Sequence, residues 1–343
     1  MRFGILTSGG DTPGMNAVIR AALIKCKNKG HELIGIKYGW KGLLENIIIE
    51  IPENLIDEVN LGGTILGSAR TNPIKQENYF DKINKTMSLN NLDVIIAIGG
   101  EDTLGAAKQL FDEGFPLIGV PKTIDNDLDA TDYTFGFNTA ITIVTEAFDR
   151  LKTTAKSHER VMVVEIMGRH AGWMTLHGGI AGGAHIILIP EYELSIKTIC
   201  NVLQKRFDAG HNWALVAVSE GYGFHKTGEV VIDQEKDEYG HFLLEKQEVG
   251  VSIAKIIEEK LGKTTRATVL GHTQRGGPPT SFDRVLCTQL GLKAIELAET
   301  KNFGKMPALE GTKIITVSLD KAVSRLKTVD LDSWKVALDI MGI

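Results

Sequence analysis

VIIAIGGED, at residues 94–102, joins an apolar run to a glycine turn that carries two carboxylates. The run does not alternate apolar and polar residues, as expected of a parallel strand buried on both faces. Residues 160–166, RVMVVEI, show the same lack of alternation. The sequence therefore predicts parallel sheets with helices on both faces.

Similar short runs alternate with longer helical patterns along the chain, which indicates an α/β protein. A sheet of more than about ten strands is uncommon, and the helical segment 138–156 offers a natural divide. We expect two stacked Rossmann-like domains with an active-site cleft between them. The polar, turn-rich segment 223–247 is expected to form an exposed hairpin or loop. The predicted strands are 3–8, 93–98, 116–120, 160–166, 185–189, 214–219, 267–270 and 313–318.

The two expected domains are discontinuous in sequence. The first combines residues 1–137 with about 274–325, and the second combines residues 138–273 with about 326–343.

Composition narrows the class of protein. The chain has 343 residues, 43% of them hydrophobic, enough for a sizeable core. A net charge of −5 without a Lys/Arg cluster argues against nucleic-acid binding. There is no signal-peptide pattern or long apolar stretch, so we expect a cytoplasmic protein without a membrane role. Cys26, Cys200 and Cys287 lie far apart and are expected to be buried, reduced thiols.

Two glycine-rich segments have the character of phosphate-binding turns. TSGGDTPGMN, at residues 7–16, lies between a predicted strand and a helix, where backbone N–H groups and the helix dipole attract phosphate. It lacks the Gly-Lys-Ser/Thr of a Walker A loop, and alone it is equally compatible with a simple tight turn. LGGTILGSAR, at residues 61–70, ends in an arginine.

Two further segments carry the chemical groups of a phosphoryl-transfer site. GGEDTLG, at residues 99–105, presents Glu101 and Asp102, and such hard oxygen ligands suit Mg²⁺ near phosphate oxygens. PKTIDND, at residues 121–127, places a lysine beside two aspartates. A cation for phosphate oxygens would thus lie next to a possible base for a sugar hydroxyl.

Together these segments resemble the phosphofructokinase family, in family order from near residue 4 to about residue 290. The resemblance implies two Rossmann-like domains, with fructose 6-phosphate and the phosphoryl donor meeting in the cleft. The first expected domain would then bind the phosphoryl donor and its metal, and the second would bind fructose 6-phosphate. The matching segments are SGGD (8–11) with GMN (14–16), GGT (62–64) with GSAR (67–70), GG (99–100), TIDND (123–127), MGR (167–169), EG (220–221) and GHTQRGG (271–277).

The resemblance also implies residue roles. Asp125 would take the proton of the sugar 1-hydroxyl, assisted by Lys122, Thr123 and Arg169. Arg160 and Arg266 would reach the 6-phosphate from a neighbouring subunit, which implies a homodimer or homotetramer. An isolated arginine more often forms a surface ion pair, but the surrounding motifs favour the phosphate. The implied sugar-binding residues are Thr123, Asp125, Asp127, Arg160, Met167, Gly168, Arg169, Glu220, Arg266, His272 and Arg275.

Asp102 and Lys122 indicate which phosphoryl donor is used. ATP-using members of the family typically carry glycine at both positions, whereas the pair Asp102 and Lys122 resembles the pyrophosphate-dependent branch. A carboxylate at 102 would crowd and repel a nucleotide, while Lys122 could contact compact pyrophosphate. Alternatively, Asp102 ligates Mg²⁺ with either donor and Lys122 pairs with a nearby acid. The implied donor-binding residues are Gly10, Arg70, Asp102 and Lys122, with Mg²⁺ on Glu101 and Asp102.

The resemblance thus implies reversible phosphoryl transfer between pyrophosphate and fructose 6-phosphate, serving glycolysis and gluconeogenesis. An ATP-dependent phosphofructokinase of the mixed-donor group and a catalytically silent regulatory subunit remain the alternatives. His158, His170 and His177 lack zinc-site spacing, so no transition metal is expected. The segment GHNW at residues 210–213 lacks the basic cluster of the allosteric bacterial ATP enzymes, which makes effector regulation doubtful.

Overall fold

The computed structural model describes residues 1–223 and 248–343. The loop expected over residues 223–247 therefore lies outside the described residues, apart from Gly223. The chain divides into two compact units. Unit 1 contains residues 1–139 and 275–326, and unit 2 contains the described parts of 140–274 together with 327–343.

Unit 1 is built on an eight-stranded sheet with the order β12-β11-β5-β4-β1-β2-β3, in which β6 pairs with β5. Its inner strands are parallel, whereas β11–β12 and β2–β3 are antiparallel pairs. The strands are β1 (Arg2–Thr7), β2 (Glu32–Ile36), β3 (Ile48–Glu50), β4 (Val94–Gly99), β5 (Leu117–Thr123), β6 (Phe135–Gly136), β11 (Lys305–Glu310) and β12 (Lys313–Ser318).

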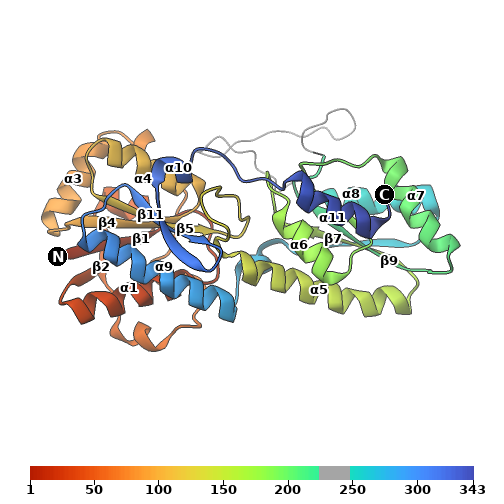
Figure 1. Cartoon of the computed structure of the whole chain (residues 1–343), viewed down its shortest axis with the longest axis horizontal. Helices are drawn as coiled ribbons and strands as arrows, with labels where there is room; N and C mark the ends of the chain where they lie inside the picture. The colour runs from red at the N-terminus through yellow and green to blue at the C-terminus, as the bar shows by residue number, and fades with distance from the viewer. Residues whose placement is uncertain (224–247) are drawn as a thin grey trace. The chain divides into compact units, whose positions relative to one another are not determined.

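Helices cover both faces of this sheet, with α1 and α9 on one face and α3, α4 and α10 on the other (Figure 1). The helical elements are α1 (Met15–Lys29), α2 (Trp40–Glu45), η1 (Glu53–Asp57), η2 (Pro73–Lys75), α3 (Tyr79–Leu89), α4 (Glu101–Asp112), α9 (Ser281–Glu299) and α10 (Leu319–Ala322).

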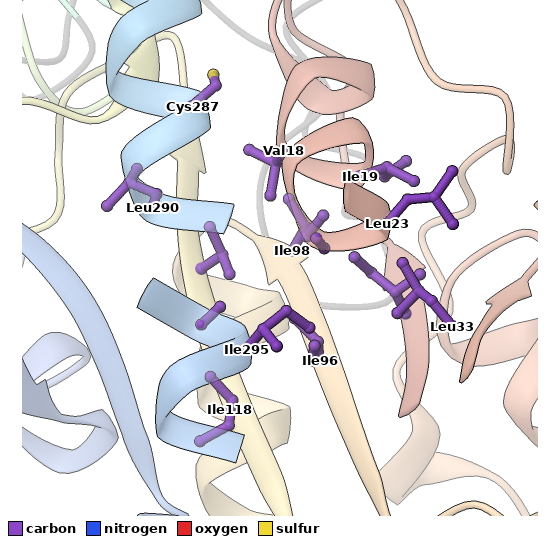
Figure 2. Packing of buried hydrophobic residues seen from close by; sticks show 14 of the residues in the cluster. Val18, Ile19, Leu23, Leu33, Ile96, Ile98, Ile118, Cys287, Leu290 and Ile295 are labelled. Atoms are coloured by element: carbon purple, nitrogen blue, oxygen red, sulfur yellow. The ribbon is translucent and has the colours of Figure 1, made fainter. Parts of the chain in front are cut away.

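Burial on both faces explains why the sequence of β4 does not alternate between apolar and polar residues. Ile96 and Ile98 point into a core shared with α1 and α9, which Figure 2 shows from close by. Ile95 and Ala97 point into the second core beneath α4. Because successive side chains of a strand point to opposite faces and both faces are covered, every position is apolar.

Unit 2 contains a four-stranded, all-parallel sheet with the order β10-β7-β9-β8. Helix α5 (Phe137–Ser157) starts in unit 1 and continues into unit 2. The remaining elements are β7 (Val161–Ile166), α6 (Trp173–Gly182), β8 (Ile186–Leu188), α7 (Ile196–Asp208), β9 (Ala214–Ser219), α8 (Val249–Leu261), β10 (Thr265–Val269) and α11 (Leu331–Met341). The turn η3 (Gly271–Arg275) also lies here, except for its last residue, which belongs to unit 1.

The α/β class and all eight predicted strands are confirmed, with boundary shifts of up to three residues. The sequence prediction missed β2, β3, β6 and β11. Strand β11 contains Pro307, which argues against a strand, yet its antiparallel pairing with β12 tolerates it. Strand β2 contains Gly35, and glycine also argues against a strand. A glycine fits here because an added Cβ would lie only 2.6 Å from the Leu66 side chain.

The cysteine prediction is correct for two of three residues. Cys26 and Cys287 are buried free thiols, whereas Cys200 is only partly buried. None of the helices in the described ranges combines the length and apolarity needed to cross a membrane.

Candidate active site

The predicted donor and catalytic segments of unit 1 meet at one edge of its sheet. Strands β5, β4 and β1 are parallel neighbours, so the segments that follow them emerge side by side. Gly10 lies in the turn after β1, Glu101 and Asp102 begin α4 after β4, and Lys122 and Thr123 end β5. Ligands of open α/β sheets bind at this carboxyl edge.

Lys122 is the buried cation of this edge, with only 4% of its surface exposed. Its Nζ donates a hydrogen bond of 2.5 Å to the carbonyl oxygen of Gly10. Burial, and then the nearby charge of Arg275, lower the pKa of Lys122 to about 8, opposed by Asp125 and Asp127 among the nearby acids. The charge is therefore poorly solvated and available to an anion bound at the turn.

Arg275 brings a second cation to the same turn. Its Nη1 donates to the Asp11 carbonyl oxygen at 3.2 Å. A Cβ on Gly10 would lie 2.6 Å from that Nη1, so only glycine allows the guanidinium to approach the backbone this closely. The structure thus brings together Gly10, Lys122 and Arg275.

The loop after β5 is braced by side chains. The Thr123 hydroxyl accepts from the Asp125 backbone N–H at 3.1 Å, while Asn126, at a φ of 52°, accepts from the Thr134 N–H at 2.9 Å. The Thr134 hydroxyl donates to the Thr123 carbonyl oxygen at 2.7 Å. These bonds fix the positions of the two aspartates on either side of Asn126.

The two aspartates form an acidic pair. Burial and the neighbouring charge of Asp125, with a smaller contribution from Glu101, raise the pKa of Asp127. Like charges that share a buried site favour uptake of a proton or a cation.

Two of the pockets on unit 1 are lined by predicted donor residues. One of about 520 Å³ is lined by both glycine-rich segments and includes Gly10 and Arg70. Those segments are joined by hydrogen bonds from Gly9 N–H and Ser8 Oγ to the Ala69 carbonyl oxygen. The other pocket, of about 430 Å³, is lined by Glu101 and Asp102 with parts of α4 and α10. Of the predicted donor residues, Asp102 therefore lines a different hollow from Gly10 and Arg70.

No group of three or more His, Cys, Asp or Glu side chains arranged to hold a metal occurs within residues 1–223 and 248–343. Mg²⁺ commonly uses one or two carboxylates together with phosphate oxygens and water rather than an all-protein cage. Asp127 supplies a further hard oxygen, since its Oδ1 is buried and accepts no hydrogen bond from the described residues. The donor set therefore suits the predicted ion.

In unit 2, the loop that follows β7 contains Met167, Gly168 and Arg169. The Gly168 N–H donates to Glu220 Oε1 at 3.2 Å, and the Met167 N–H donates to Gln274 Oε1 at 3.3 Å. The predicted sugar-binding segments after β7, β9 and β10 are thereby joined. His272 lies in η3, exposed beside buried Gln274.

Arg160 and Arg266 lie at the opposite end of the same sheet. Arg160 immediately precedes β7, and Arg266 pairs in register with Met162 near the start of that strand. At about 3.3 Å per residue, the length of β7 separates Arg160 from Met167 by roughly 20 Å. Arg266 Nη1 lies 3.4 Å from Glu258 Oε1 at the surface. Within one chain, these two arginines therefore lie far from the Met167–Arg169 loop.

Three further residues, Asp11, Ser219 and Gln274, contact or influence the predicted site residues although their sequence context predicts no individual role. Asp11 is one of the charges that act on Lys122. Ser219 and Gln274 are fully buried and bond the backbone of the loop after β7. Ser219 lies beside the EG segment at 220–221, and Gln274 lies within GHTQRGG at 271–277. Their burial depends on contacts with distant chain segments, so no local sequence pattern predicts it.

A family model described as phosphofructokinase matches residues 2–298. The chain is 50% identical to a pyrophosphate–fructose 6-phosphate 1-phosphotransferase from Amycolatopsis methanolica, over all of both proteins. It is 48% identical to an ATP-dependent 6-phosphofructokinase 3 from Streptomyces coelicolor, over 96% of each.

Solved structures give the same fold. A phosphofructokinase from Saccharomyces cerevisiae matches with a TM-score of 0.81 and 28% identity over 99% of this chain, which spans 46% of that longer chain. A pyrophosphate-dependent phosphofructokinase from Marinobacter aquaeolei matches with a TM-score of 0.82 over 100% of this chain and 91% of that chain. At 22% identity, the latter shows the fold alone.

Proposed function

Because the chain belongs to the phosphofructokinase family, we propose that it transfers a phosphoryl group reversibly from pyrophosphate to the 1-hydroxyl of fructose 6-phosphate. The products are fructose 1,6-bisphosphate and phosphate, and the reaction serves glycolysis and gluconeogenesis in the cytoplasm. Unit 1 binds the donor, and unit 2 binds the sugar phosphate.

The observation that carries the choice of pyrophosphate is the buried Lys122 ammonium at the Gly10 turn. A fixed, poorly hydrated cation stabilises the compact charge of a transferring phosphoryl group. Asp102 supports the same donor, because a carboxylate at the start of α4 repels the additional phosphate of a nucleotide. The relative at 50% identity that bears the pyrophosphate name agrees with this choice.

In the forward reaction, Asp125 accepts the proton of the 1-hydroxyl. A carboxylate held in place by the braced loop after β5 can take this proton as a general base. Thr123 holds the backbone of Asp125, while Lys122 and Arg169 offset the charge of the transferring group. Glu101 and Asp102 would hold Mg²⁺, which when bound neutralises charge on the phosphate oxygens.

The sugar phosphate is recognised by arginine forks and by polar groups after β7, β9 and β10. The 6-phosphate requires Arg160 and Arg266 of a neighbouring subunit, because in one chain these side chains lie at the other end of β7. We therefore propose a homodimer or homotetramer. The full set is Thr123, Asp125, Asp127, Arg160, Met167, Gly168, Arg169, Glu220, Arg266, His272 and Arg275, with Gly10, Arg70, Asp102 and Lys122 for the donor.

The test is turnover of the purified protein with pyrophosphate and with ATP, measured as fructose 1,6-bisphosphate formed in the presence of Mg²⁺. We expect a higher kcat/KM for pyrophosphate and, in reverse, phosphate-dependent formation of pyrophosphate. A higher kcat/KM for ATP would replace the proposed donor, and no turnover with either would remove the proposed activity.

An ATP-dependent reaction is the second candidate, because relatives at 48% and 44% identity carry that name. The same comparison of donors separates the two candidates.

A further inference from the structure

Gln274 is the only buried residue of the Gly271–Arg275 turn, and none of its surface is exposed. A fully buried amide must be hydrogen-bonded, since an unmet polar group costs free energy. Its Nε2 donates to the Gly271 carbonyl oxygen at 3.0 Å. Its Oε1 accepts from the Met167 N–H at 3.3 Å. The amide therefore joins its own turn to the loop after β7.

The same loop is held from the other side by the end of β9. The Ser219 hydroxyl donates to the Gly168 carbonyl oxygen at 2.5 Å, and the Gly221 N–H donates to the same oxygen at 3.2 Å. Gly168 has a φ of 137°, and an added Cβ would lie 2.8 Å from the Ala171 carbonyl oxygen. The backbone that precedes Arg169 is thus bonded on both sides and has little room to move.

We propose that Gln274 is a positioning residue, which sets the distance between His272 in the η3 turn and the Met167–Arg169 loop. The inference rests on the proposed function, in which both segments contact fructose 6-phosphate. Gln274 itself need not touch the substrate. Its two hydrogen bonds instead hold the η3 turn and the loop after β7 at a fixed distance, and side chains of these two segments contact the substrate. Misplacement of such side chains strongly weakens substrate binding and turnover.

The test uses Gln274→Met, which keeps the length of the side chain but removes both hydrogen bonds. Gln289→Met makes the same change at an exposed position of α9 and is the matched control. Calorimetric titration of the full-length protein measures the Kd of fructose 6-phosphate and, separately, that of pyrophosphate with Mg²⁺. Thermal unfolding reports whether each variant is folded.

Loss of one buried, geometry-setting bond to a binding loop is expected to raise the sugar Kd at least about tenfold. The pyrophosphate Kd should remain within about twofold, and Gln289→Met should change neither. A purely structural role would lower the unfolding temperature and leave both Kd values of the folded protein unchanged. A rise of less than about threefold in the sugar Kd of folded Gln274→Met would overturn the inference.

If Gln274→Met does not fold, Ser219→Ala decides the question by the same criterion. It removes one bond to the Gly168 carbonyl oxygen and leaves the Gly221 bond in place. We expect a smaller rise, of about threefold to fivefold, in the sugar Kd alone; an unchanged value would overturn the inference. Failure of wild-type protein to bind fructose 6-phosphate would instead overturn the proposed function.

Discussion

The two units arrange their predicted functional residues differently. In unit 1, the segments after β1, β4 and β5 lie at one edge of one sheet, and Lys122 bonds directly to the Gly10 turn. In unit 2, the Met167–Arg169 loop follows β7, whereas Arg160 precedes the same strand. A single chain can therefore assemble the proposed donor side, whereas we propose that a second chain completes the sugar side. Two variants in unit 1 should therefore not complement each other between subunits, whereas a variant of either arginine should complement a variant in unit 1.

The largest effect is expected from Asp125→Asn, which keeps the shape of the side chain but cannot accept a proton. We expect kcat to fall by about 10²–10⁴ with a modest change in sugar affinity. Steady-state kinetics at saturating pyrophosphate measures this. Asp127→Asn is the comparison and should cost less, because we assign it a positioning role. A near wild-type kcat in Asp125→Asn would remove that residue from the role of base.

Lys122→Met should lower kcat with pyrophosphate by about 10²–10³ and raise KM less, because a cation that stabilises the transition state acts mainly on kcat. Mixed and reassembled with Asp125→Asn, it should remain inactive, since both changes disable the same side of the site. Kinetics of the mixture provides the readout. Recovery of activity would mean that the unit 1 site is itself shared between chains.

Arg160→Ser should raise the KM for fructose 6-phosphate by about 10–100-fold, the loss expected for a charge-assisted hydrogen bond to phosphate. Reassembly with Asp125→Asn should restore about a quarter of wild-type activity in a symmetric dimer, because half the dimers are hybrid and each has one intact site. Size-exclusion chromatography of differently tagged chains verifies that hybrids form. Hybrids without recovered activity would contradict completion of the site in trans.

The parts of the site that the sequence could predict are those made by neighbouring residues or by successive strand ends. Lys122, Thr123 and Asp125 lie within four positions, and their place after an apolar run puts them at the carboxyl edge of a parallel sheet. The lack of alternation in β4 likewise predicts its burial on both faces. Such inferences need only local pattern and the general geometry of α/β folds.

The remaining parts depend on contacts between distant segments. The burial of Gln274 is caused by the packing of its turn against the loop after β7, more than 100 positions earlier, and no local pattern marks it. Similarly, Gly10 and Asp102 both lie in glycine-rich turns that follow parallel strands. Asp102 nevertheless lines a separate pocket, whose wall includes part of α10. Motifs indicate which residues matter, whereas tertiary packing decides which of them share a space.

Asp102→Gly tests whether that separate pocket can admit part of a nucleotide. Removal of the carboxylate relieves repulsion and opens space, so kcat/KM for ATP should rise about tenfold, equivalent to about 1.4 kcal/mol. The double variant with Lys122→Gly is the stronger test, because the Lys122 side chain still limits ATP activity in the single variant. Parallel kinetics with both donors measures the preference. An unchanged preference in all variants would mean that these side chains do not determine the donor.

The smallest expected effect concerns stability at the amino end of the unit 2 sheet, the end that carries Arg160. His185 immediately precedes β8, and its Nδ1 accepts from the Leu215 N–H at 2.9 Å. Burial, and then the charge of Arg206, lower the pKa of His185 to about 4 from 6.5, with smaller effects of Lys152 and His211. The folded protein therefore binds fewer protons here than the unfolded chain between these two values.

Because the unfolded chain takes up the proton first, the contribution of His185 to stability is complete above about pH 6.5 and decreases as the pH falls toward 4. Between pH 7.5 and 5.5, the free energy of unfolding should decrease by about 1 kcal/mol on account of this residue. His185→Asn, whose amide oxygen can still accept from Leu215, should lose that part of the pH dependence. His158→Asn is the matched control, because it makes the same change at an exposed position of unit 2. Denaturant unfolding at both pH values measures the difference, and equal pH dependence of wild type and His185→Asn would show that this imidazole is not the titrating group.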